Sequence, residues 1–240
     1  MFEIHEFRDY ETLSQKAAEI VLEKIKQEKV VLGLATGSSP EGLYQNLVKA
    51  HQGGISFKHV VTFNLDEYVG IDQNHPQSYY TFMHEKLFKH VDVLSTNIHI
   101  PSGTGSMETV TEQYEALLKD HPQDIQVLGL GSNGHIGFNE PGTSFDSSCH
   151  IVRLKKQTRT DNARFFDSID SVPSFAITMG IQDIMRAKEI LLIATGEKKA
   201  QAIYDLVKGK ITEDIPCTIL QKHPKVIVLV DELAGKLLHD

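Results

Sequence analysis

Short apolar runs alternate with longer amphipathic stretches along the chain. Residues 12–27 show the helical pattern, in which apolar positions recur three and four residues apart and so share one face. Thr12 and Gln15 have the spacing of a capping box, so we expect the helix to begin at Thr12. The apolar positions of this stretch are Leu13, Ala17, Ile20, Val21 and Ile25.

The first strong strand signal follows directly. Residues 29–35 are a near-continuous apolar run, which is typical of a parallel strand covered on both faces. Further strands are predicted at 59–65, 125–131, 175–180, 189–195 and 225–230. Further helices are predicted around 40–51, 78–90, 106–119, 197–208 and 231–238.

This alternation of strands and helices predicts the fold class. It favours an α/β fold with three layers, in which a mostly parallel central sheet lies between two layers of helices. The sequence shows no repeat, low-complexity tract or linker, so we expect residues 1–240 to form a single domain. In such folds, ligands bind outside the carboxyl ends of the strands. The loops that follow the strands are therefore where functional residues are expected.

Composition narrows the classes of partner. Asp and Glu number 32 against 24 Lys and Arg, for a net charge of −8, and no basic tract is present. Nucleic acid and anionic membrane surfaces are therefore not expected as partners, because both require clustered cations. The apolar runs are too short to span a bilayer. Cys149 and Cys217 have no metal-ligand spacing, and the N-terminus is unlike a signal peptide, so we expect a cytoplasmic protein.

The first strand-end loop carries Thr36, Gly37, Ser38 and Ser39 ahead of Pro40. Ser is a good helix N-cap and Pro is favoured at the first helical position, so we expect Ser39 to cap a helix that starts at Pro40. Backbone N–H groups at a helix N-terminus suit a phosphate. An ordinary capped loop has the same appearance, and no Walker A sequence follows.

The second strand-end loop carries Asp66 and Glu67. A carboxylate at this edge of the sheet can take a proton from carbon if its surroundings keep it ionised and dry. For an isolated acidic pair, we favour the simpler interpretation that Asp66 caps a turn and Glu67 is solvated.

The third loop contains Gly129, Gly131 and Gly134 in the spacing G-x-G-x-x-G, which is the pattern of a dinucleotide-binding turn. That interpretation requires a helix straight after the glycines and an acidic residue about 20 positions on. Neither is present, because Gly137, Pro141 and Gly142 follow and no carboxylate stands in the stretch around residues 150–154. The loop instead presents Asn133, His135 and Glu140. Histidine is the side chain best suited to moving protons near neutral pH.

Two cations follow later strands. Arg164 and Lys199 could hold an anionic substrate, although position alone favours solvated charges on helix faces. The stretch 84–90 is not an H-E-x-x-H motif, and no other spacing indicates a metal site. We therefore expect no metal site.

Taken together, the stretches TGSSP, VTFNLDEYVG, HPQSYYTFM, GSNGHIGFNEPG, TRTDNARFF and GEKKA resemble the glucosamine-6-phosphate deaminase family. The resemblance runs in order from about residue 30 to residue 232. It implies a Rossmann-like α/β/α fold. It also implies conversion of glucosamine 6-phosphate and water to fructose 6-phosphate and ammonia, without metal or organic cofactor.

The resemblance implies a role for each matching residue. Asp66 is the base that moves the C2 proton to C1 through an enolamine. His135 is the acid–base group that opens the pyranose ring, and Glu140 is its partner. Substrate-binding positions are Thr36, Gly37, Ser38, Ser39 and the active-site tyrosine Tyr79, with Arg164 and Lys199 on the phosphate.

Two positions depart from the enteric members of the family. An Asp precedes the GHI stretch there, whereas Asn133 stands here. An Asn carbonyl can accept the histidine N–H and fix its tautomer, but it cannot stabilise an imidazolium by charge. The Arg and Lys that bind the activator N-acetylglucosamine 6-phosphate at a subunit interface fall at His150 and Val152. We therefore expect no such activation, and a monomer or small homo-oligomer rather than a hexamer.

Three alternative functions explain these motifs less well. A 6-phosphogluconolactonase shares the fold and a GHI-type loop, but would not explain DEYVG or FNEP. A non-catalytic sugar-phosphate sensor would lack catalytic residues, whereas Asp66, His135 and Glu140 are present. A nucleotide-binding oxidoreductase is not expected, because the helix after the glycines and the acidic residue that it requires are missing.

Overall fold

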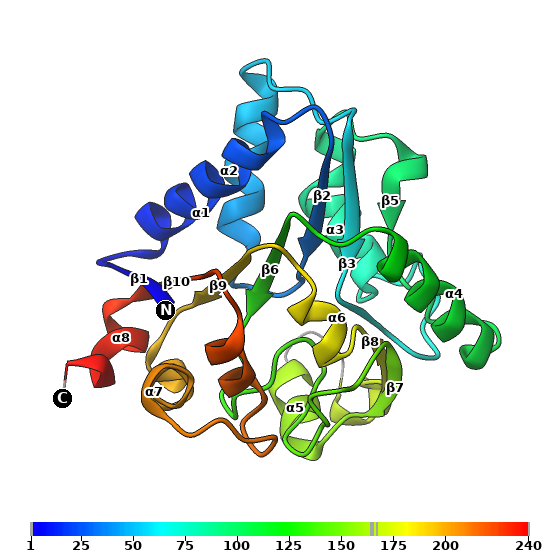
Figure 1. Cartoon of the computed structure of the whole chain (residues 1–240). Helices are drawn as coiled ribbons and strands as arrows, with labels where there is room; N and C mark the ends of the chain where they lie inside the picture. The colour runs from blue at the N-terminus through cyan, green and yellow to red at the C-terminus, as the bar shows by residue number, and fades with distance from the viewer. Residues whose placement is uncertain (1, 164–165, 167, 240) are drawn as a thin grey trace.

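A seven-stranded sheet forms the centre of the molecule (Figure 1). The computed structural model describes residues 2–163, 166 and 168–239. All the strand pairings in this sheet are parallel. In spatial order the strands are β1 (Phe2–Phe7), β10 (Val226–Asp231), β9 (Ile190–Ala194), β6 (Ile125–Gly129), β2 (Val30–Leu34), β3 (Val60–Asn64) and β5 (Ile98–His99).

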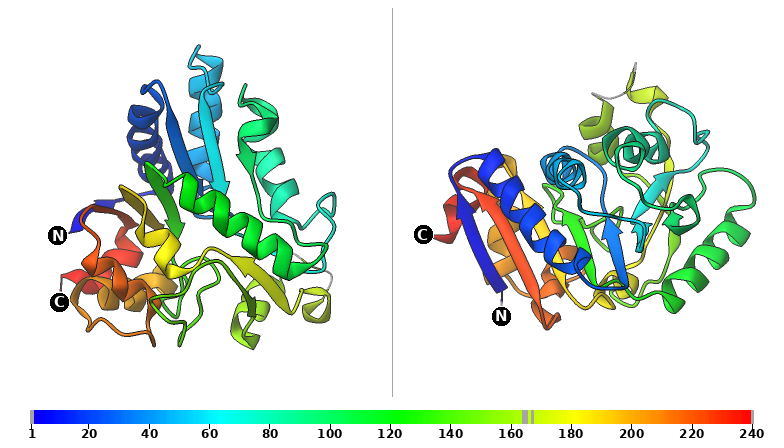
Figure 2. Two further views of the ribbon diagram at one scale, coloured as in Figure 1. Left: turned by 45° about the vertical axis from the view of Figure 1, so that its right-hand side comes forward. Right: turned by 90° about the horizontal axis from the view of Figure 1, so that it is seen from above.

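Helices cover both faces of this sheet. The α-helices are α1 (Tyr10–Ile25), α2 (Glu41–Gln52), α3 (Tyr79–Lys86), α4 (Met107–Asp120), α5 (Lys156–Asn162), α6 (Ile181–Met185), α7 (Ala200–Lys208) and α8 (Glu232–Gly235). Helices α1 and α2 pack against each other, and Figure 2 shows α2 and α4 on opposite sides of the strands. The expected three-layer α/β fold with a mostly parallel sheet is confirmed.

The burial of the strands explains their apolar sequence pattern. All five residues of β2 and all five of β9 are buried, as a strand between two helix layers requires. On α1 the predicted apolar positions Leu13, Ala17, Val21 and Ile25 are buried, whereas Ile20 is half-buried.

Two predicted helix starts were wrong. Helix α1 begins at Tyr10, because Asp9 is its N-cap and accepts the Thr12 N–H at 2.8 Å. Helix α2 begins at Glu41 with Pro40 as its N-cap, and no side-chain hydrogen bond from Pro40 caps it. A carboxylate one turn earlier therefore replaced Thr12, and Ser39 lies in the preceding loop.

A second, smaller sheet was not predicted. It has three antiparallel strands in the order β4 (Asp66–Tyr68), β8 (Phe175–Thr178) and β7 (His150–Arg153). The run 175–180 was expected in the parallel sheet, but its strand pairs here. The chain passes from β3 into β4 after the single residue Leu65, so no helix returns it to the central sheet. This small sheet supports Asp66.

The order of the strands locates the crevice. The chain moves from β2 towards β3 and β5 on one side, and from β6 towards β9 and β10 on the other. The direction of winding thus reverses between the neighbours β2 and β6. Ligands of doubly wound folds bind at the carboxyl ends of the strands at such a point. The loops after β2 and β6 are therefore held next to each other.

Candidate active site

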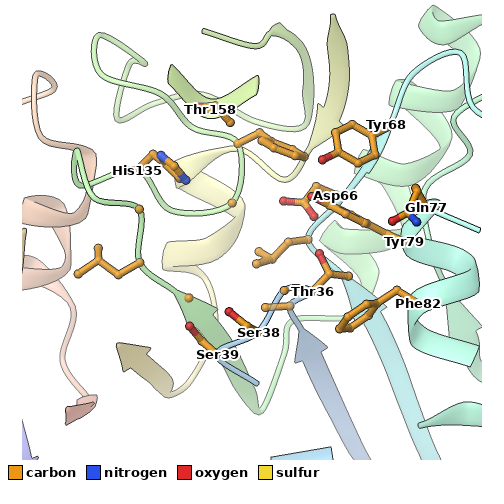
Figure 3. Close-up of a pocket in the computed structure, with 18 of the residues that line it drawn as sticks. Thr36, Ser38, Ser39, Asp66, Tyr68, Gln77, Tyr79, Phe82, His135 and Thr158 are labelled. Carbon is orange, nitrogen blue, oxygen red and sulfur yellow. The ribbon is translucent and has the colours of Figure 1, made fainter. Parts of the chain in front are cut away.

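A cavity of about 1250 Å³ opens where the chain leaves the carboxyl ends of β2 and β6. It is large for a small-molecule site, since such pockets usually measure about 300–1000 Å³. Figure 3 shows residues on several sides of it: His135 and Thr158 across from Asp66, Tyr68 and Tyr79, with Thr36, Ser38 and Ser39 after β2. Segments far apart in the sequence therefore meet around one space.

The loop after β2 presents its backbone to this cavity. Residues 35–39 all line it, and Gly37 has a φ of 99°, a conformation that favours glycine. The Tyr10 hydroxyl of α1 donates to the Ser38 carbonyl at 2.7 Å and lies 3.0 Å from the Ser39 carbonyl. The same hydroxyl accepts the Gly42 N–H at 2.8 Å. Tyr10 thus caps α2 from another helix.

The far end of this loop is held in a similar way. The Tyr44 hydroxyl donates to the Ala35 carbonyl at 2.5 Å. With these carbonyls turned towards tyrosines, no described residue accepts a hydrogen bond from the N–H groups of Gly37, Ser38 or Ser39. N–H groups at a helix N-terminus form a site for an anion. The four predicted substrate-binding residues of this loop, Thr36, Gly37, Ser38 and Ser39, therefore lie together at the cavity.

Asp66 faces the cavity from β4 and is buried, with 6% of its surface exposed. No described residue donates a hydrogen bond to its carboxylate. Burial raises the pKa of Asp66 well above its usual value, and the neighbouring negative charge of Glu67 raises it further. The simpler expectation, that Asp66 caps a turn, was wrong. A carboxylate so placed is a stronger base than an exposed one.

Glu67 is not solvated, contrary to expectation. It is only 3% exposed, and its two oxygens accept the backbone N–H groups of Tyr68, Tyr79 and Tyr80, each at 2.9 Å. Sequence spacing contained no sign of this contact, because Tyr79 and Tyr80 belong to α3 and not to the acidic strand.

The loop after β6 brings Asn133, His135 and Glu140 together. Asn133 Oδ1 lies 2.7 Å from His135 Nδ1 and accepts the His135 backbone N–H at 3.2 Å. Because that backbone group is a donor, the amide atom facing it is the oxygen. Asn133 Nδ2 then donates to Glu140 Oε2 at 3.2 Å, while His135 Nδ1 lies 4.0 Å from the same oxygen. The asparagine therefore bridges the histidine and the glutamate.

The glycines of this loop serve packing rather than a nucleotide. No helix follows Gly129 among the described residues until α5 begins at Lys156, which excludes the dinucleotide-binding geometry. A side chain at Gly131 would overlap the His135 imidazole, and one at Gly134 would lie 2.5 Å from Ile215 Cγ2. Close approach to the histidine is what the Gly131 position requires.

Aromatic side chains form the wall beside Asp66. Tyr79, a predicted site residue, lines the cavity with its ring 4.8 Å from that of Tyr68 and stacked on Phe138 at 5.9 Å and 8°. Burial raises the pKa of Tyr79 well above its usual value, so its hydroxyl stays protonated.

Tyr68 and Thr158 are among the lining residues that sequence reasoning missed. Tyr68 directly follows the acidic pair, and Thr158 lies in the segment that carries Arg164. The buried Thr158 hydroxyl donates to Glu140 Oε1. Nearness to a predicted motif was the only available signal for either residue.

The two predicted cations are Lys199 and Arg164. Lys199 ends a 3-10 turn (Glu197–Lys199) ahead of α7 and lines the cavity. Gly196, before that turn, donates its N–H to both oxygens of Asp231, at 3.0 and 2.9 Å. Arg164 lies outside the described residues.

Other classes of site find no support in the described part of the chain. No group of three His, Cys, Asp or Glu residues there could hold a metal ion. No helix among the same residues has the length and apolarity needed to cross a membrane. His150 and Val152 lie on β7, and His150 Nδ1 is 2.8 Å from the Ser148 carbonyl.

Comparisons with known proteins agree with this architecture. The family model described as glucosamine-6-phosphate isomerases/6-phosphogluconolactonase matches residues 8–228. A glucosamine-6-phosphate deaminase of Halalkalibacterium halodurans is 50% identical over 235 residues, covering 96% of each chain. One of Oceanobacillus iheyensis is 53% identical over 230 residues, covering 94% of this chain and 92% of its own.

Solved structures give the same result. A monomeric glucosamine-6-phosphate deaminase has a TM-score of 0.96 and 47% identity, covering 98% of this chain and 99% of its own. A 6-phosphogluconolactonase from Leishmania guyanensis has a TM-score of 0.81 at 19% identity over 98% of each chain, which shows the shared fold alone. The chain therefore belongs to the family of glucosamine-6-phosphate isomerases and 6-phosphogluconolactonases.

Proposed function

We propose that this enzyme converts glucosamine 6-phosphate and water to fructose 6-phosphate and ammonia, within one domain that spans the chain. Relatives about half identical over nearly their whole length carry the name of this activity. The observation that carries the proposal is the buried Asp66 carboxylate on one side of the cavity, with His135, Asn133 and Glu140 on the other.

Ring opening is assigned to His135. Opening the pyranose needs a proton on the ring oxygen and removal of one from the anomeric hydroxyl, and one imidazole can do both in turn. The hydrogen bond to Asn133 Oδ1 places the proton on Nδ1, and proton exchange with the sugar is assigned to Nε2. Glu140 holds the Asn133 amide, and so the imidazole, in this orientation.

Isomerisation is assigned to Asp66. The open-chain aldehyde carries an acidic proton at C2, which the carboxylate removes to leave an enolamine. Asp66 returns that proton to C1, which gives the imine of fructose 6-phosphate. Water adds to the imine carbon, and ammonia leaves. A positioned base contributes about 10²–10⁴ in rate.

The sugar phosphate is assigned to the backbone N–H groups of residues 37–39, with Lys199 and Arg164 as the cations. Charge-assisted hydrogen bonds of this kind are about twice as strong as neutral ones. They explain how a chain of net charge −8 binds an anion.

Oligomeric state and regulation are part of the proposal. The structural relative is described as monomeric, and His150 and Val152 replace the two cations expected of an activator site. We therefore propose a cytoplasmic enzyme that is a monomer or small homo-oligomer and that N-acetylglucosamine 6-phosphate does not activate. Sigmoidal kinetics that this compound abolishes would contradict the proposal.

The decisive assay measures ammonia and fructose 6-phosphate released from glucosamine 6-phosphate by the purified protein and by Asp66→Asn. We expect equal amounts of the two products from the wild type and a loss of about 10²-fold or more in the variant. Hydrolysis of 6-phosphogluconolactone without ammonia release would favour the lactonase branch of the family. Sugar-phosphate binding without turnover would favour a sensor.

A further inference from the structure

The carboxylate of Glu67 joins two elements of the site. It is 3% exposed and lies on β4, beside Asp66. Oε1 accepts the Tyr79 N–H and Oε2 accepts the Tyr80 N–H, both at 2.9 Å. These residues are the first two of α3. A side chain of the strand therefore binds the N-terminus of the helix.

This contact completes the cap of α3. The first N–H groups of a helix have no partner within it and must find one elsewhere. The side chain of Ser78, the N-cap, accepts the Thr81 N–H at 3.0 Å. Glu67 takes the two that remain before it, and its negative charge is favourable at a helix N-terminus.

The contact also sets distances within the site. Successive residues of a strand point to opposite faces, so Asp66 faces the cavity while Glu67 faces α3. Tyr79 is the first residue of that helix, and its ring stacks on Phe138. Tyr79 and Asp66 lie on the same side of the cavity (Figure 3). Any movement of α3 relative to β4 would move Tyr79 relative to Asp66.

We propose that Glu67 is a positioning residue, which anchors the first turn of α3 on β4 and thereby holds Tyr79 against Asp66. The catalytic consequence rests on the proposed function, whereas the anchor itself does not. Misplacement of reacting groups by about 1 Å can cost about 10²-fold in rate.

Charge gives the anchor a second effect. The titratable groups around Asp66 are Glu67 and Tyr68 on β4, Tyr44 on α2, Tyr79 on α3, Tyr114 on α4, and His135 across the cavity. Burial raises the pKa of Tyr44, Tyr79 and Tyr114, which keeps them neutral. Glu67 is therefore the nearby negative charge that raises the pKa of Asp66.

Glu67→Gln tests both effects. A glutamine keeps one acceptor oxygen but turns an N–H donor towards one of the helix N–H groups, so the anchor weakens and the charge is lost. We expect amide hydrogen exchange at Tyr79 and Tyr80 to accelerate about tenfold or more as the first turn opens. We expect kcat/KM to fall by about 10–100-fold, and the acid limb of the pH–rate profile to move to lower pH.

Two further variants separate the causes. Glu67→Asp keeps a charge beside Asp66 but is shorter, so we expect faster exchange and a lower rate with the acid limb nearly unmoved. This milder variant also carries the test if Glu67→Gln does not fold. Glu189→Gln is the matched control, because Glu189 is another buried glutamate, paired with Lys24 and Lys225 just before β9 begins. It is expected to change neither α3 exchange nor the pH profile.

Unchanged exchange at Tyr79 and Tyr80 in both Glu67 variants would overturn the anchor. Faster exchange with kcat/KM and the acid limb as in the wild type would overturn the positioning role. If the wild-type protein releases no ammonia from glucosamine 6-phosphate, the proposed function fails, and hydrogen exchange still decides the anchor.

Discussion

At the scale of single residues, Asn133 is the most informative position. Its amide accepts from His135 Nδ1 at 2.7 Å and donates to Glu140 Oε2 at 3.2 Å, so a neutral group separates the imidazole from the carboxylate. Glu140 is held from its other oxygen by Thr158. The amide fixes the histidine tautomer by geometry, and the remaining negative charge is 4.0 Å from Nδ1.

Replacing Asn133 with Asp tests whether charge matters here. The new carboxylate would contact His135 directly and favour the protonated imidazole, so we expect the pKa that governs ring opening to rise. The basic limb of the pH–rate profile should then move to higher pH. An unchanged profile would count against any electrostatic role for this position.

The burial of Asp66 predicts a cost in stability. A carboxyl group whose pKa is raised on folding stabilises the protein below its unfolded pKa, and that stability is lost as pH rises through the folded pKa. Asp66→Asn should therefore raise the melting temperature near pH 7, by about 2–4 °C for each kcal/mol relieved.

The same comparison near pH 4 provides the control. There the carboxyl group of the unfolded chain is itself about half protonated, since its pKa is about 3.9. The difference in melting temperature between Asp66→Asn and the wild type should shrink. A variant less stable than the wild type at pH 7 would show that the Asp66 carboxylate is favourably bound in the folded protein.

At the scale of elements, the N-terminus of α2 depends on a residue from another helix. Tyr10 holds the Ser38 and Ser39 carbonyls and accepts the Gly42 N–H, in place of a side-chain cap from Pro40. The N–H groups of residues 37–39, by contrast, have no acceptor among the described residues. The proposed anion site thus depends on α1 as well as on α2.

Tyr10→Phe should weaken phosphate binding without slowing the chemical step. A hydrogen bond of this kind is worth about 0.5–1.5 kcal/mol, so we expect KM for glucosamine 6-phosphate to rise by about 2–10-fold at constant kcat. The inhibition constant of inorganic phosphate should rise by the same factor. Tyr204→Phe, on α7, is the control. Equal constants in Tyr10→Phe and the wild type would refute the assignment.

Elements with a strong local pattern were predictable, and those specified by long-range contacts were not. The buried strands β2, β3, β6, β9 and β10 are apolar runs and were predicted. The edge strand β1 mixes exposed and half-buried residues, and the three-residue strand β4 is too short to show a period. Its partner β8 was recognised as a strand, but no local signal assigned it to the antiparallel sheet.

The site divides in the same way. Residues within distinctive motifs, such as Asp66 and His135, could be named from the sequence because the resemblance covers them. Glu67 could not be interpreted, since its partners are backbone N–H groups of α3, which carry no side-chain signal. Tyr10 was missed because it lies outside every motif, and only packing of α1 on α2 brings it to the loop.

At the scale of the whole molecule, topology explains how separate motifs form one site. The winding reverses between β2 and β6, so the loops carrying residues 36–39 and His135 face one another across the cavity. Strand β4 leads directly out of β3 and places Asp66 against the same space. No helix follows Gly129 before α5 in the described part of the chain, and Gly131 leaves room for the His135 imidazole.

The proposed proton transfer by Asp66 is tested most directly by following the hydrogen at C2 of the substrate. With glucosamine 6-phosphate deuterated at C2, we expect slower turnover and deuterium at C1 of the fructose 6-phosphate, because Asp66 carries the deuterium between the two carbons. Asp66→Asn should release ammonia at least about 10²-fold more slowly and transfer no label. Ammonia released at the same rate as from the unlabelled substrate, with no deuterium at C1, would contradict proton transfer by Asp66.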